Sequence, residues 1–124
     1  MDMLRELPDT TQVEGEPKRR WFNSPELDLI VWLGDDDKPV GFQLCYDKPH
    51  NERALTWHED RGFDHSGVDD GEQTPAEHNR TPILVTDGLF DRDRVKRKFL
   101  EASAEVPEPI RKFVARTLDR YTGP

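Results

Sequence analysis

The chain has 124 residues and a formal net charge of −8 at pH 7, which indicates one domain large enough to bury a single core. Its one cysteine excludes an internal disulfide and favours a reducing compartment. The first residues lack the apolar run of a signal peptide, and no stretch reaches the roughly 18 apolar residues of a membrane span. We therefore expect a cytoplasmic protein with no membrane partner.

The negative charge is concentrated in the first 88 residues, which hold 20 Asp and Glu against nine Lys and Arg. The remaining residues hold six Asp and Glu against nine Lys and Arg. Because an acidic surface repels phosphate groups, this charge disfavours nucleic acid as a general partner and suits a basic one. The plain alternative is that the charge serves solubility alone.

Residues 1–17 contain proline, glycine and several acidic residues without sustained periodicity. This composition predicts a mobile acidic N-terminal tail, followed by a single domain over residues 18–124. Apolar residues begin at Trp21 and Phe22, which indicate a short first strand.

Two strand-like runs, 27–33 and 40–46, flank a turn at 34–39 and predict an antiparallel hairpin. Side chains of a strand alternate between faces, so the register can be tested against the pattern. With Leu33 opposite Val40, the aliphatic residues of both strands share one face. A slip of one residue would separate these pairs, so the pattern selects this register. The opposed pairs on the apolar face are Val31 with Phe42, Leu29 with Leu44, and Leu27 with Tyr46.

A third strand over 52–58 continues the same face, with Leu44 meeting Leu55 and Phe42 meeting Trp57. A fourth strand is expected over 63–68, after a turn at 59–62. A simple hairpin puts its Phe63 and His65 on the mixed face, whereas a bulge at Gly67 would change the facing. A polar loop over 69–80 then leads to a short strand over 81–86.

Two helices are predicted near the end of the chain. Apolar residues recur at helical spacing from Val95 to Val106 and again from Ile110 to Tyr121, separated by Pro107 and Pro109. Both apolar stripes need a partner surface, and the apolar sheet face is available. The fold class is therefore α+β, with a mainly antiparallel sheet of four to six strands and two C-terminal helices packed on one face.

The sheet face that such helices would leave uncovered is mixed in character and is the candidate binding surface. A large aromatic residue, Trp32, would lie opposite Gly41 on this face and act as an apolar anchor, with polar neighbours to orient a ligand. The opposite interpretation is that a loop or the N-terminal segment folds over the face. The candidate binding residues are Trp32, Gln43, Cys45, Thr56, His58 and His65.

These observations favour a small, soluble, non-catalytic binding or protein-interaction module. Its partner would be a protein, a second copy of the chain or a small molecule. One alternative is a hydrolytic or metal-assisted enzyme that uses His58, His65 and the carboxylates of residues 69–72. Cys45 beside a histidine also has the composition of a nucleophile and its base. However, the sequence lacks a tightly spaced ligand pair, so we predict neither a metal nor a cofactor, and no catalytic residue is assigned.

A second alternative is a nucleic-acid accessory protein that uses the basic run over 92–98 on the first helix. Acidic residues dilute this run, and no aromatic stacking platform accompanies it. The same bases could equally lie in solvent, or contact the acidic half of another copy or of the chain itself. The sequence also lacks a glycine-rich phosphate loop, a G-x-S-x-G motif and a C-x-x-C pair.

Overall fold

The computed structural model describes residues 3–8, 10, 12, 14–15, 17–48, 52–68, 84–86 and 90–121. Seven strands form one antiparallel sheet in which each strand pairs with its neighbours in the sequence. Two helices, α1 (Arg92–Ala102) and α2 (Glu108–Asp119), follow the strands. The strands are β1 (Arg5–Glu6), β2 (Lys18–Asn23), β3 (Asp28–Leu33), β4 (Pro39–Tyr46), β5 (Arg53–His58), β6 (Gly62–Val68) and β7 (Leu84–Thr86).

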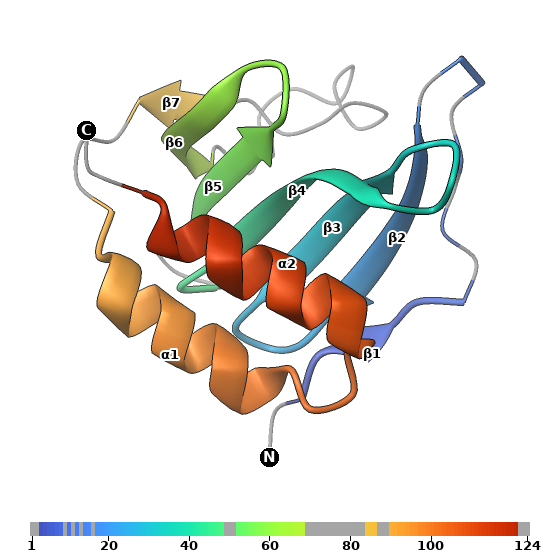
Figure 1. Cartoon of the computed structure of the whole chain (residues 1–124). Coiled ribbons are helices and arrows are strands. Elements are labelled where there is room, and N and C mark those ends of the chain that lie inside the picture. Colours follow the sequence, from blue (N-terminus) through green and yellow to red (C-terminus); the bar gives the residue numbers. More distant parts are fainter. Residues whose placement is uncertain are drawn as a thin grey trace, which may run out of the picture.

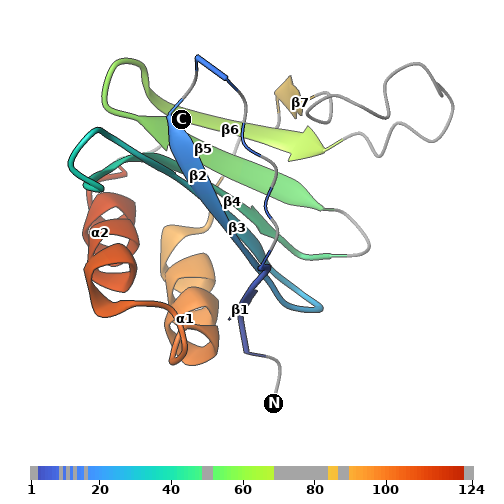
Figure 2. The same ribbon diagram turned by 90° about the vertical axis from the view of Figure 1, so that its right-hand side faces the viewer.

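The two helices lie side by side on one face of the sheet, and neither crosses to the other face (Figures 1 and 2). This arrangement confirms the predicted α+β class with both helices packed on one side. Six of the strands match predicted strands, and β1 is the additional one.

The predicted register is confirmed across the centre of the sheet. Val31 pairs with Phe42, and Leu44 pairs with both Leu29 and Leu55. One pairing was wrong: Leu33 lies opposite Pro39 rather than Val40, because the register shifts at the end of β3. A bulge of this kind leaves one residue unpaired and changes the facing only beyond it.

The core lies between the apolar sheet face and the helices. Val95 and Phe99 of α1 and Val114 and Leu118 of α2 are fully buried against the strands. Burying such a side chain contributes roughly 1.5–3 kcal/mol, so these two stripes hold the helical layer in place. Asp91 caps α1, and its carboxylate accepts a hydrogen bond from the Arg94 backbone N–H at 3.2 Å.

The start of the chain takes part in the core, which differs from the predicted mobile tail over residues 1–17. Leu4 is fully buried, and its backbone N–H donates to the Ala102 carbonyl at 2.8 Å. Arg5 and Glu6 then pair with the last residues of β2. A single buried leucine beside a two-residue strand has no periodicity, so the sequence pattern gave no sign of this contact.

The facing of β6 also differs from the simple hairpin. Phe63 pairs with Trp57 and His65 pairs with Leu55, so both side chains belong to the helix-covered face. The reason is the turn, in which Gly62 has a φ of +76° and pairs directly with His58. Three residues then separate the paired positions, a common hairpin geometry that needs a left-handed residue, usually glycine.

Candidate functional site

The sheet face away from the helices carries the candidate binding surface, which we call the open face. Strands β2 to β5 place aromatic, aliphatic and polar side chains there, since the register fixes which residues alternate onto it. Five of the six predicted binding residues lie on the open face, and His65 does not. Among the residues of the open face are Trp21, Ile30, Trp32, Gln43, Cys45, Ala54, Thr56 and His58.

Trp32 and His58 form the aromatic centre of the open face. Their ring centroids are 5.2 Å apart with an interplanar angle of 35°, and both residues are half-buried. Gly41 separates them in the sheet, as predicted for Trp32. A Cβ atom at Gly41 would lie 3.2 Å from the His58 ring and 2.8 Å from the Trp57 carbonyl oxygen. The missing side chain therefore lets the two rings approach each other.

A short polar chain runs beside this aromatic pair. The Thr56 hydroxyl donates to the Gln43 amide oxygen at 3.4 Å, and the Gln43 amide nitrogen donates to the Cys45 sulfur at 3.5 Å. Cys45 is only 7% exposed, and its burial raises the pKa of the thiol to about 12. Because the thiolate is the nucleophilic form, Cys45 is an inert, protonated side chain at neutral pH. The geometry therefore does not favour the nucleophile interpretation.

A group of charged and polar residues at the start of β3 was not predicted from the sequence. The Lys48 ammonium lies 3.1 Å from an Asp28 carboxylate oxygen, and the Asn23 amide donates to the same oxygen at 2.5 Å. Burial and the nearby Asp28 charge raise the pKa of Glu52 above its usual value. Alternation along the predicted strand over 52–58 places Glu52 on the same face as Cys45. This alternation was the sequence signal that could have indicated the group.

His65 belongs to a different cluster, inside the helix-covered face. Its Nε2 hydrogen-bonds the Tyr46 hydroxyl, and its ring meets the edge of Phe90 at a centroid distance of 5.2 Å. His58 and His65 therefore lie on opposite faces of the sheet and do not converge on one cleft. Residues 69–72 of the proposed enzyme site lie outside the described residues. Within the described part of the chain, no group of three metal-ligating side chains comes together.

The basic run on α1 is largely engaged with acidic residues of the same chain. Arg94 pairs with Asp47, while Lys96 lies 2.6 Å from Asp119. Lys98 reaches Glu26 at 3.4 Å and Asp47 at 3.8 Å, and Arg92 donates to the carbonyl oxygens of Asp119 and Tyr121. The contacts of Arg94 and Lys98 match the interpretation in which the run contacts the acidic half of its own chain, whereas Lys96 and Arg92 contact residues 119 and 121 of the C-terminal part. All of these contacts reduce the free positive charge available to phosphates.

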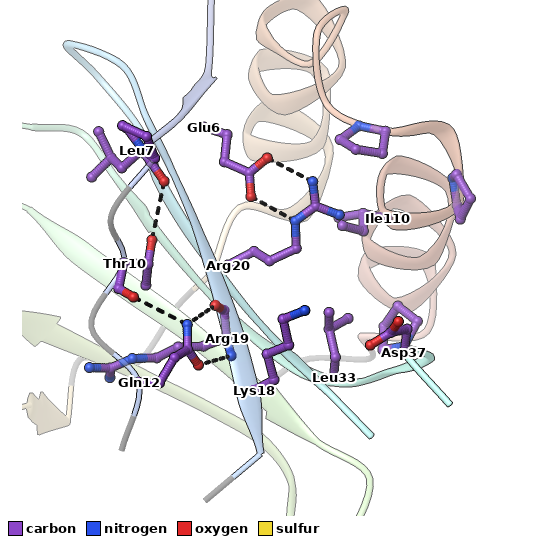
Figure 3. Close-up of a pocket in the computed structure, with 14 residues that line it drawn as sticks. Glu6, Leu7, Thr10, Gln12, Lys18, Arg19, Arg20, Leu33, Asp37 and Ile110 are labelled. Carbon is purple, nitrogen blue, oxygen red and sulfur yellow. Dashed lines mark hydrogen bonds and ion pairs between the residues drawn. The ribbon is translucent and has the colours of Figure 1, made fainter. Parts of the chain in front are cut away.

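A pocket of about 390 Å³ lies at the outer edge of β2, away from the predicted site residues (Figure 3). At its centre the Arg20 guanidinium donates two hydrogen bonds of 2.7 Å to the Glu6 carboxylate. This pairing lowers the pKa of Glu6 and raises that of Arg20. The wall is partly aliphatic. Its lining residues are Glu6, Leu7, Pro8, Thr10, Gln12, Lys18, Arg19, Arg20, Leu33, Asp37, Pro39, Pro107, Pro109 and Ile110.

No protein-family model, curated protein or solved structure matches this chain. Among the described residues, neither helix has the length and apolar character needed to cross a bilayer.

Proposed function

We propose that this protein is a non-catalytic protein-interaction module that binds its partner through the open face. The observation that carries the proposal is the position of Trp32 and His58, two half-buried rings on the side of the sheet that no helix covers. Aromatic residues with a polar rim are typical of the energetic centre of protein interfaces.

The neighbours of the aromatic pair support this use. Trp21 and Ile30 pair across β2 and β3 on the same face and are also only half-buried. Leaving such apolar area in water costs roughly 25 cal/mol per Å², so a partner that covers it gains that energy. Thr56 supplies a hydroxyl beside the rings, and Gln43, which is only 6% exposed, accepts a hydrogen bond from it. Together they form a surface with an apolar anchor and a polar border.

The arrangement gives less support to catalysis. The Cys45 thiol is protonated at neutral pH, and the two histidines of the enzyme alternative are separated by the sheet. An interaction surface needs neither group to react. It needs rigid strands that hold the side chains in place, and β3, β4 and β5 provide these.

Site-specific photo-crosslinking tests the proposal. A benzophenone amino acid placed at Ile30 on the open face should give a discrete adduct with one partner in the cells that produce the protein. The same amino acid at Leu100, an exposed residue of α1, is the matched control. Trp32→Ala should abolish the adduct formed from position 30 while the circular dichroism spectrum stays native.

Two results would contradict the proposal. One is the absence of a specific adduct from position 30, and the other is an identical set of adducts from positions 30 and 100. An adduct between two copies of the chain would identify the partner as a second copy, and sedimentation should then show a dimer that Trp32→Ala dissociates.

A further inference from the structure

Among the described residues, no strand pairs with the whole outer edge of β2. Single backbone and side-chain groups of the chain bond to the rest of this edge. β1 pairs only with Phe22 and Asn23. Beyond it, the Leu7 N–H donates to the Trp21 carbonyl at 2.8 Å. The Gln12 side-chain amide then bonds both backbone groups of Arg19, accepting from its N–H at 2.9 Å and donating to its carbonyl at 2.8 Å. Two residues thus satisfy three backbone groups that a neighbouring strand would normally satisfy.

The chain turns away from this edge after Leu7. The Thr10 hydroxyl donates back to the Leu7 carbonyl at 3.3 Å, and the Gln12 amide also donates to the Thr10 carbonyl at 3.2 Å. These contacts are among exposed residues, so water competes for each of them. The described residues of this covering segment, Leu7, Pro8, Thr10 and Gln12, are therefore held to β2 through hydrogen bonds for which water can compete.

The register shows what an added strand would meet. Glu6 pairs with Phe22, so an antiparallel strand continuing the β1 row would place residues opposite Arg20 and Lys18. Because alternate side chains share a face, the added residues opposite Arg20 and Lys18 would lie on the same side of the sheet as Phe22. The pocket between β2 and α2 opens on that side (Figure 3). Leu33 and Ile110 line this pocket and would contact the aliphatic stem of an acidic side chain placed there.

The charge of the edge favours an acidic partner over a basic one. Lys18, Arg19 and Arg20 are consecutive in a chain of net charge −8. The covering region already offers an acid to this edge, since Glu6 pairs with Arg20 and its pKa is lowered by Arg20 and also by Lys18. Opposite charges on facing strands stabilise the pairing, so an acidic strand fits the edge better than a basic one.

We propose that the Lys18–Trp21 edge of β2 is a docking site for an extended acidic segment of a partner protein, which adds to the sheet as an antiparallel strand. The covering segment of the chain itself occupies this edge in the free protein. Binding by strand addition uses main-chain hydrogen bonds for affinity and side-chain pockets for specificity. This edge shares Trp21 with the open face, but the two tests read different contacts, namely side-chain adducts from position 30 and main-chain pairing with a peptide, so either proposal can fail without the other.

The test uses a fluorescent peptide of alternating glutamate and valine, with blocked ends, and follows its anisotropy with the full-length protein. Gln12→Ala removes two of the competing hydrogen bonds and should tighten peptide binding about tenfold relative to the native protein. Glu14→Ala, a change at another exposed residue near the same segment, should leave binding native-like. Amide hydrogen exchange should accelerate at Arg19 in the Gln12→Ala variant and stay unchanged at Val31, which shows that the fold is intact.

Two control peptides separate the causes. A lysine–valine peptide should bind at least tenfold more weakly, and a backbone N-methylated glutamate–valine peptide should not bind. The proposal is overturned if Gln12→Ala does not tighten binding, or if either control peptide binds as well as the acidic one. It is also overturned if the variant pairs with a second copy of itself in place of the peptide.

Discussion

Arg94 of α1 holds Asp47, the residue that follows β4, through two parallel hydrogen bonds of 2.9 Å. The same guanidinium lies 5.8 Å from the centre of the Tyr46 ring. Asp47 itself has a left-handed backbone, with a φ of 61°. The pair therefore fixes the first helix to the point where the chain leaves the central strand, and it ties the two layers together by charge as well as by apolar contact.

This pair should make stability depend on pH. Arg94 lowers the pKa of Asp47 below its ordinary value of 3.8. The ionised carboxylate is favoured in the folded state, so its contribution is complete above the ordinary pKa and is lost as pH falls through the lowered one. Asp47→Asn should cost about 1 kcal/mol near neutral pH, because the pair is partly exposed. Urea unfolding should show this difference shrinking in strong acid, and a pH-independent difference would exclude the assigned role.

Gly41→Ala tests the close approach beneath Trp32 and His58. The new Cβ would lie 2.8 Å from the Trp57 carbonyl oxygen, which belongs to the backbone and cannot move freely. We expect a loss of about 2 kcal/mol in the free energy of unfolding. Gly34→Ala is the matched control, because its Cβ would meet a Val40 methyl carbon at 3.2 Å and that side chain can shift. Equal losses in the two variants would contradict this account.

Cys45 should resist thiol reagents while the protein is folded. The side chain is buried, and its pKa of about 12 keeps the thiolate scarce at the mildly alkaline pH of a disulfide-exchange assay. Reaction with an aromatic disulfide should be slow in native buffer and fast in denaturant. Rapid stoichiometric labelling of the folded protein would show that the thiol is accessible and would reopen its candidacy as a nucleophile.

Glu52→Gln should stabilise the protein near neutral pH. Burial and the charge of Asp28 raise the pKa of Glu52, so the charged form is disfavoured in the folded state. A raised pKa means that stability is lost as pH rises through it, and the uncharged amide avoids this loss. We expect a gain of about 0.5 kcal/mol near pH 7 that diminishes on acidification. Thermal unfolding measures it, with Glu105→Gln, at an exposed position, as the control.

The parts of the fold that the sequence predicted are those governed by repeated patterns. Alternation fixed the pairing of Val31 with Phe42 and of Leu44 with Leu55, and helical spacing found the buried Val95 and Phe99. Each pattern involves several residues that agree with one another. The facing of His65 depended instead on the backbone of Gly62 alone, and one residue in a turn produces no repeated signal.

The candidate site likewise has one part that the sequence predicted and one part that it did not. Parity placed Trp32, Gln43, Cys45, Thr56 and His58 on one face, because a strand offers only two faces. The β2 edge and its pocket depend on contacts from Gln12 and from the start of α2, which are distant in the sequence. Spacing within a segment carries no information about such contacts.

The order of the elements bears on how the protein is made. Every strand precedes both helices, and each strand pairs with the one before it. During synthesis the sheet can form hairpin by hairpin, whereas Phe42, Leu44 and Leu55 stay uncovered until α2 has left the ribosome. A ribosome stalled within the last helix would therefore display a complete sheet whose apolar face is exposed to solvent. We expect chaperones to bind such a nascent chain preferentially.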